Sequence, residues 1–157
     1  MSDSNGREDL CQLLQQYLDQ FYANSWSDGE IVAREDAIGS ALRTIPSDDR
    51  SRLIMEQVAP RNPVIAFNIA VEAECKTDTL LTLLKLGVSS AGTAQFGFWT
   101  DQAVRFFTPD VGVNAVMGSL PPDRDLIELA QYHFRCSAGA AWSQYEQCIE
   151  EWLRRDP

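Results

Sequence analysis

An apolar stretch, residues 62–86, constrains the fold more than any other part of the chain. Between Val64 and Ala73 only Asn68 and Glu72 are polar. A segment that is apolar on nearly every side must be covered by neighbouring elements, because its exposure to water would be unfavourable. The stretch therefore predicts where the core lies, and the other segments are expected to pack around it.

Residues 64–75 fit two kinds of secondary structure. As a strand, alternate side chains would share a face of a sheet. As a helix, the segment would have Asn62 as its cap and Pro63 at its first position. The helix is favoured, because the flanking segments are helical in pattern and no partner strand is evident. Asn68 and Glu72 then stand one turn apart and form a narrow polar stripe.

Amphipathic helices are expected on both sides of this stretch. Over residues 10–22, apolar side chains recur at the three- and four-residue spacing of one helix face. Residues 27–30 form a Ser-x-x-Glu capping box that begins a second helix, and the acidic residues in 47–49 favour the start of a third. Residues 142–153 carry aromatic and aliphatic side chains on one helical face, which we expect to pack on the first helix and so bring the termini together.

Residues 87–122 differ in character, because glycines interrupt them and five aromatic rings lie between Phe96 and Phe107. We expect an irregular segment that covers one end of the helices and places its rings in the core. The alternative is a recognition surface, because five rings exceed what a short covering segment needs. On that alternative, the partner-binding residues would be Phe98, Trp99, Asp101, Phe106 and Phe107.

These patterns predict an all-α protein. We expect one domain over residues 1–157, with residues 1–4 disordered. About seven helices, joined by short turns, would form a helical bundle or a short stack of helical hairpins. The glycine- and aromatic-rich segment 87–122 would be the irregular part of this domain.

The charge of the chain bears on its partners. The 23 acidic and 13 basic side chains give a net charge of −10. A nucleic-acid surface needs clustered Lys and Arg, so we expect no nucleic-acid partner. An electropositive protein is the partner that an acidic surface would attract. No segment reads as a secretory leader or a membrane span, which favours a cytoplasmic protein without a membrane partner.

Little in the sequence points to catalysis. Phosphate-binding glycine loops, nucleophile elbows and zinc-ligand pairs are absent from the sequence, and His133 is the single histidine. The four cysteines are scattered without a Cys-x-x-Cys pair, so they are read as free thiols in a reducing compartment. We therefore expect neither a metal site nor a cofactor.

One polar constellation is a catalytic alternative. It consists of Asn68, Glu72 and Glu74 within the apolar stretch. If Glu72 lies in an apolar environment, its pKa should rise, as a general acid or base would require. The competing interpretation is an ordinary paired carboxylate on a solvent stripe.

The leading functional hypothesis is a small acidic protein-interaction module in a bacterial-type cytosol. Such a module could be an adaptor, a chaperone-like subunit, or an inhibitor or immunity-type protein for a basic partner. The rival is a small enzyme or ligand-binding protein with a pocket around Glu72. An exposed apolar patch bounded by acids would favour the first hypothesis, and a buried pocket with convergent polar groups would favour the second. A DNA-associated regulator is a third and weaker reading because of the net charge.

Overall fold

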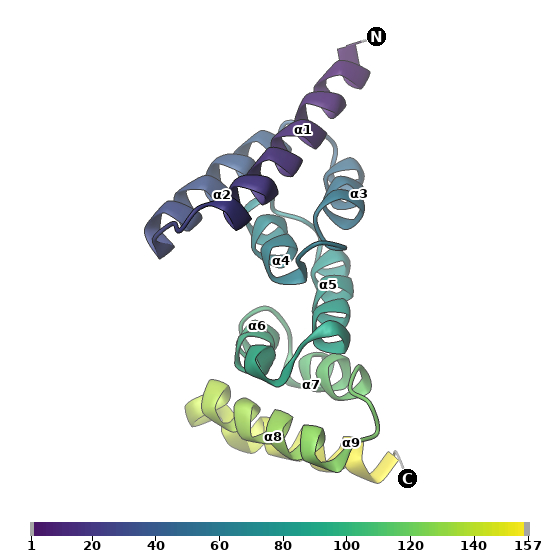
Figure 1. The fold of residues 1–157 in the computed structure, drawn as a ribbon. Helices are drawn as coiled ribbons and strands as arrows, with labels where there is room; N and C mark the ends of the chain where they lie inside the picture. The colour runs from purple at the N-terminus through teal and green to yellow at the C-terminus, as the bar shows by residue number, and fades with distance from the viewer. Residues whose placement is uncertain (1, 156–157) are drawn as a thin grey trace. The chain divides into compact units, whose positions relative to one another are not determined.

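The computed structural model of the protein describes residues 2–155, and the side chains of residues 4–155. These residues form helices joined by turns, with no strand among them (Figure 1). The all-α prediction is confirmed. The elements are α1 (Ser2–Ala23), α2 (Asp28–Leu42), α3 (Ser47–Gln57), α4 (Pro63–Glu72), α5 (Thr77–Ser90), η1 (Thr93–Gln95), α6 (Phe96–Phe106), α7 (Pro109–Gly118), α8 (Arg124–Ala138), η2 (Gly139–Ala141) and α9 (Trp142–Arg155).

The apolar stretch contains helix α4, and the alternative strand is wrong. The Asn62 side chain accepts a hydrogen bond from the backbone N–H of Ile65 at 3.1 Å, and Pro63 occupies the first turn. Both features match the predicted cap. Ile65, Phe67 and Ile69 are buried along the helix. Local capping chemistry and burial thus agree in making this segment a core helix.

Two arginines bind the carboxyl end of α4. Arg43 donates to the carbonyl oxygen of Glu72, and Arg50 donates to that of Ala73 at 2.7 Å. Glu74 follows with a φ of 54°, which turns the chain out of the helix. The last carbonyl groups of a helix lack intrahelical partners and carry partial negative charge, so guanidinium groups stabilise this end.

The chain divides into two compact units, Met1–Leu83 (unit 1) and Leu84–Pro157 (unit 2), and the division falls within α5. We expected a single domain over residues 1–157. In unit 1, α4 packs against α2 and α3, and α1 also contacts both of these helices. The largest side chains buried here are Leu14, Leu18, Leu42, Leu53, Ile54, Phe67, Ile69 and Leu83.

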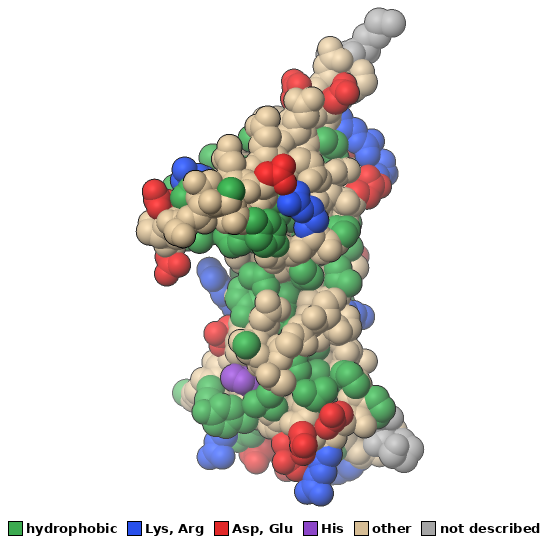
Figure 2. Space-filling view, viewed as in Figure 1, with side chains coloured by type: hydrophobic (Ala, Val, Ile, Leu, Met, Phe, Trp, Pro, Cys, Tyr) green, Lys and Arg blue, Asp and Glu red, His purple; other side chains and the backbone are tan. Residues whose placement is uncertain are grey.

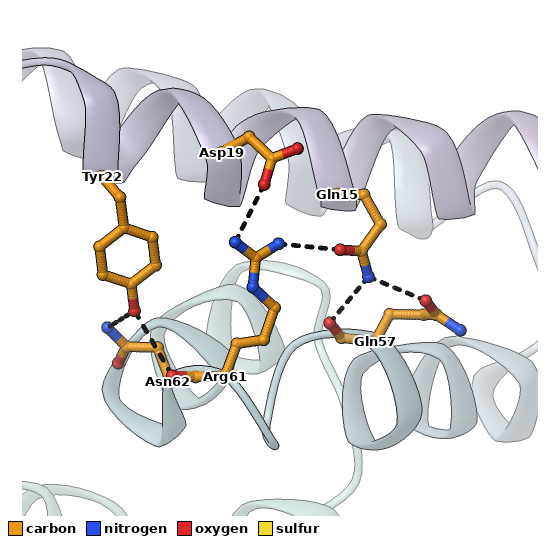
Figure 3. Close-up of polar contacts among 6 residues, drawn as sticks. All are labelled: Gln15, Asp19, Tyr22, Gln57, Arg61 and Asn62. Carbon is orange, nitrogen blue, oxygen red and sulfur yellow. Dashed lines mark hydrogen bonds and ion pairs between the residues drawn. The ribbon is translucent and has the colours of Figure 1, made fainter.

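A polar network joins α1 to the turn between α3 and α4 (Figure 3). Arg61 lies at its centre, with guanidinium nitrogens 2.9 Å from both the Asp19 carboxylate and the Gln15 side-chain oxygen. The amide of Gln15 continues to Gln57 at 2.9 Å. The groups of this network that bind Arg61 are exposed, and exposed ion pairs stabilise a fold little. The network therefore orients the turn rather than contributing a large share of the stability.

In unit 2, α6 packs against α7 and α8, and α9 packs against the same two helices. The aromatic face of α9 was expected to pack on the first helix of the chain; its partners within unit 2 are α7 and α8. Trp99, Met117 and Phe134 are fully buried, and the Phe134 ring stacks on Tyr145 with 5.9 Å between centroids. A β-carbon on Gly87 would collide with the indole of Trp99. The absence of a side chain at position 87 therefore makes room for the largest ring of the core.

The structure corrects three expectations from sequence. Residues 87–122 are not irregular, because they contain α6 and α7 as well as η1, and the described residues hold more helices than the seven or so expected. Some glycines that read as helix breakers are packing contacts, as Gly87 is. Helix α1 begins at Ser2, so residues 2–4 are helical rather than disordered, and residue 1 lies outside the described residues.

Candidate functional site

A hollow of about 620 Å³ lies in unit 2 where the end of α7, the following turn, α8 and the last turns of α9 meet. We call it the α7–α9 groove. Its volume falls within the range of known ligand sites. The apolar residues that line it are Met117, Leu120, Pro121, Pro122, Ile127, Trp152 and Leu153, and its polar residues are Arg124, Glu128 and Gln131.

The sequence makes this groove through the connection between α7 and α8. Helix α7 ends at Gly118, and the Pro121-Pro122 pair cannot continue a helix. Asp123 then caps α8 by accepting a hydrogen bond from the backbone N–H of Asp125 at 2.9 Å. These signals hold residues 119–123 in a non-helical path beside α9.

Apolar surface remains uncovered in the groove. Leu153 is 41% exposed, and Trp152 beside it on α9 is half-buried. Met117 is buried at 1% exposure and also lines the hollow. An apolar hollow with an exposed leucine and an accessible indole has the composition of a docking site.

Charged pairs lie on the helices that form the groove. Arg124 and Glu128 are 2.8 Å apart on α8, and Arg154 and Glu150 are 3.7 Å apart on α9. Figure 2 shows acidic and basic side chains beside hydrophobic ones in this part of unit 2. Exposed pairs of this kind are weak, so their members can exchange partners with a bound chain at small cost.

The structure corrects the prediction that Trp99 binds a partner. The structure places it in the core of unit 2 at 1% exposure, against Gly87 and edge-to-face with Phe98 at 4.8 Å between centroids. Helix α6 packs against both α7 and α8, so its inward face is covered. Trp99 therefore fills the core and is not accessible to a partner.

The other predicted residues remain at least partly accessible. Phe98, Phe106 and Phe107 are half-buried, and Asp101 is exposed and accepts a hydrogen bond from the Ser137 hydroxyl. None of them lines the α7–α9 groove. Binding of a partner by these residues stays a prediction, and the groove is a site that the sequence reasoning missed.

A buried acid lies near the predicted polar stripe of α4, and this acid is Glu35 of α2. It is 5% exposed and accepts a hydrogen bond from the Tyr17 hydroxyl at 3.0 Å. Asn68 also hydrogen-bonds it, and Glu72 is close enough to act on it electrostatically. Burial, reinforced by the Glu72 charge, raises the pKa of Glu35 although both hydrogen bonds oppose the rise.

The constellation of Asn68, Glu72 and Glu74 is not brought together as a unit. Asn68 turns to Glu35, whereas Glu74 is exposed and lies 3.9 Å from Arg43. Glu72 is half-buried, and its backbone oxygen accepts from Arg43. The polar cluster in unit 1 is therefore Tyr17, Glu35 and Asn68, with Glu72 beside it.

Glu35 could have been found from its register. It stands four residues after Ile31 and three before Ile38, so it shares the apolar face of the second helix. A carboxylate on such a face points to a buried acid. The hydrogen bonds from Tyr17 and Asn68 satisfy it, which is the ordinary arrangement of a structural buried carboxyl group.

Across the described side chains, His, Cys, Asp and Glu residues form no group that could hold a metal ion. None of the helices in the described part of the chain combines the length and the apolar character needed to span a bilayer. Comparison with protein-family profiles, curated proteins and solved structures gives no match. The sites are therefore interpreted from their own chemistry.

Proposed function

We propose that this protein is an interaction module that holds an apolar segment of a basic protein partner in the α7–α9 groove. The observation that carries the proposal is the pair Trp152 and Leu153, which leaves apolar surface exposed in a hollow of about 620 Å³. A partner segment with an aliphatic or aromatic anchor would cover this surface. Burial of such an anchor supplies much of the affinity in typical interfaces.

The charge of the chain supports a basic partner. The net charge is −10, and an acidic protein accelerates its encounter with a cationic one. Lys or Arg on the partner segment could pair with Glu128 and Glu150, whose present partners are exposed arginines. The groove thus suits an apolar anchor flanked by basic residues.

An adaptor, a chaperone-like subunit and an inhibitor or immunity-type protein all act in this way. We place the protein in a bacterial-type cytoplasm. This placement is supported by free cysteines at positions 11, 75, 136 and 148, which suit a reducing compartment.

The test uses defined peptides. A helical peptide with a Leu–Phe anchor and Lys flanks should bind at least about tenfold more tightly than the same peptide with Glu flanks. Chemical-shift changes of the Trp152 indole would locate binding. Leu153→Asp should abolish binding, whereas Val111→Asp should not, because Val111 is an exposed apolar residue of unit 2 outside the groove.

Three outcomes would contradict the proposal. Equal binding of both peptides would show that the partner need not be basic. Unchanged binding by Leu153→Asp would show that the peptide does not bind in the groove. Concentration-dependent dimerisation that Leu153→Asp abolishes would show that a second copy covers the groove instead.

The rival function, a small enzyme or ligand-binding protein around Glu72, has one supporting observation. Glu35, whose pKa is raised, lies beside Asn68 and Glu72. Its carboxyl group is already hydrogen-bonded by Tyr17 and Asn68, which favours a structural role. The interaction module is therefore the better-supported proposal.

A further inference from the structure

A second hollow, of about 180 Å³, lies in unit 1 between α1 and α2. We call it the α1–α2 pocket. Leu13, Ala37 and Ile38 supply apolar walls, and Arg34 supplies a positive charge. A pocket that combines aliphatic walls with a guanidinium group has the two features needed to bind an amphipathic anion.

The Arg34 side chain is held in place by an aromatic ring. Its guanidinium carbon lies 4.1 Å from the centroid of the Trp26 ring. The Tyr17 ring, which also lines the pocket, stacks on Trp26 with 5.8 Å between centroids. Cation–π contact fixes the guanidinium in advance, so less rotamer entropy is lost when an anion binds.

The carboxylates nearest to Arg34 are hydrogen-bonded to other groups, although the charge of Glu30 also acts on Arg34 electrostatically. Glu30, one turn before Arg34, accepts the backbone N–H of Ser27 at 2.8 Å in the capping box. Glu35 accepts the Tyr17 hydroxyl. Arg34 itself makes a long hydrogen bond of 3.4 Å to the Glu30 carbonyl oxygen, which occupies only one of its donors. Guanidinium donors therefore remain for a bound anion.

We propose that the α1–α2 pocket binds a small aliphatic carboxylate, with the carboxylate on Arg34 and the hydrocarbon on Leu13 and Ile38. The exposed amides of Gln16 and Gln20 also line the pocket and can donate further hydrogen bonds. A cavity of about 150 Å³ accommodates benzene, so this one suits a ligand of about six to eight non-hydrogen atoms. The proposal is independent of the α7–α9 groove, which belongs to the other unit.

The shared chemistry, a carboxylate on a short aliphatic chain, occurs in free acids and at the ends of peptides. Hexanoate represents the free acid. Acetyl-Gly-Leu with a free carboxylate represents a peptide end, of which only the terminal carboxylate, the Cα and the Leu side chain would occupy the pocket. The same dipeptide as its amide lacks the charge. Tighter binding of hexanoate would assign the pocket to small acids, and tighter binding of the dipeptide acid would assign it to peptide ends.

The experiment is an NMR titration of the full chain that follows the Arg34 Nε–H and the Trp26 indole N–H. Hexanoate should shift both signals with saturation. Hexan-1-ol, which has the same chain without the charge, should bind at least about tenfold more weakly, and hexylammonium should not bind. Equal binding of the alcohol, tighter binding of the ammonium ion, or no saturable shift with either carboxylate would overturn the proposal.

Variants locate the site. Arg34→Gln should reduce hexanoate affinity at least about tenfold, whereas Arg52→Gln, which removes an exposed arginine of α3 in the same unit, should not. Gln16→Glu keeps Arg34 and its contact with Trp26, and changes an exposed residue. It should also abolish binding, because it places a carboxylate at the pocket. Thermal melts would show that each variant is folded, and retention of binding by a folded Gln16→Glu protein would overturn the proposal even if Arg34→Gln unfolds.

Discussion

Gly39 of α2 lies against the backbone of Glu72 in α4, and a β-carbon at position 39 would stand 2.5 Å from the Cβ of Glu72. Real β-carbons do not approach one another so closely, so the two helices meet at a distance that only glycine allows. One turn later, just past the end of α2, Arg43 donates to the Glu72 carbonyl oxygen. The close approach thus brings α2 within reach of the α4 terminus.

Gly39→Ala should therefore destabilise the protein by about 1–3 kcal/mol, because the added methyl group overpacks the contact with α4. Chemical denaturation would measure the change. Gly29→Ala, also in α2, is the matched control, because nothing lies within 4 Å of its added β-carbon. That change should be neutral or stabilise by up to about 1 kcal/mol through helix propensity. A Gly39→Ala variant as stable as the original protein would contradict the close approach of α2 to α4.

Glu35 should make stability depend on pH. Its pKa is raised in the folded state, so the proton binds more tightly to the folded chain. The stability linked to this proton is fully present below the ordinary pKa of a glutamate, and it is lost as pH rises through the folded pKa. Glu35→Gln keeps an acceptor for Tyr17 without the charge. The increase in the free energy of unfolding that it gives over the original protein should therefore be larger at pH 8 than at pH 4.

Urea denaturation of both proteins across this pH range would measure the difference. Comparing the two proteins cancels the titration of the groups that do not interact with Glu35. A gain that is independent of pH would contradict a raised pKa of Glu35.

Tyr17→Phe should act in the opposite direction. It removes the hydroxyl that donates to Glu35 at 3.0 Å and leaves a buried carboxylate with one fewer donor. The expected cost is about 1–3 kcal/mol, and it should grow as pH rises, because the hydrogen bond stabilises the charged form. Equilibrium unfolding at pH 5 and pH 8 tests both statements, and a cost that falls with pH would contradict them.

Trp99→Ala should cost roughly 3–5 kcal/mol of stability, as expected for a deleted core ring. Gly87→Ala should also destabilise, because its methyl group would collide with the same indole. In the Trp99→Ala background, Gly87→Ala should cost much less, because the ring is gone. A double-mutant cycle measured by denaturation gives this coupling. Additive losses of stability would contradict the contact between position 87 and the Trp99 indole.

The four cysteines are free, so dithiothreitol should leave the melting temperature unchanged. Native-state labelling with a thiol reagent should modify the exposed Cys136 first. Burial raises the pKa of Cys75, and burial together with the Glu151 and Asp110 charges raises that of Cys148, so both should react more slowly. Mass spectrometry of the labelled peptides gives the order, and rapid labelling of Cys75 would contradict its burial.

The features predicted correctly from sequence have causes within one helical turn. Asn62 and Pro63 start α4, and the capping box from Ser27 to Glu30 is present at the start of α2. Such caps join a side chain to a backbone group three residues away, so the sequence alone specifies them. The apolar character of residues 64–73 likewise identified a core helix.

The features that were missed depend on contacts between distant segments. Trp99 could be read from sequence either as a core ring or as a surface anchor, because its burial depends on α7, α8 and Gly87, none of which adjoins it in sequence. The α7–α9 groove joins Leu120 to Leu153, and no local pattern relates these residues. Glu35 was an exception, because its register on the apolar face was visible in the sequence.

The position of helix α5 limits where the chain can be cut into fragments that fold. Leu80 and Leu83 are buried on the unit 1 side of the division, and Leu84 and Val88 on the unit 2 side. A recombination crossover at this point would leave each fragment with about half of α5, well below the roughly 12–15 residues at which isolated helices become marginally stable. A fragment or chimaera that contains either unit should therefore carry the whole of residues 77–90. Where both units are made as separate fragments, each should have its own copy of these residues.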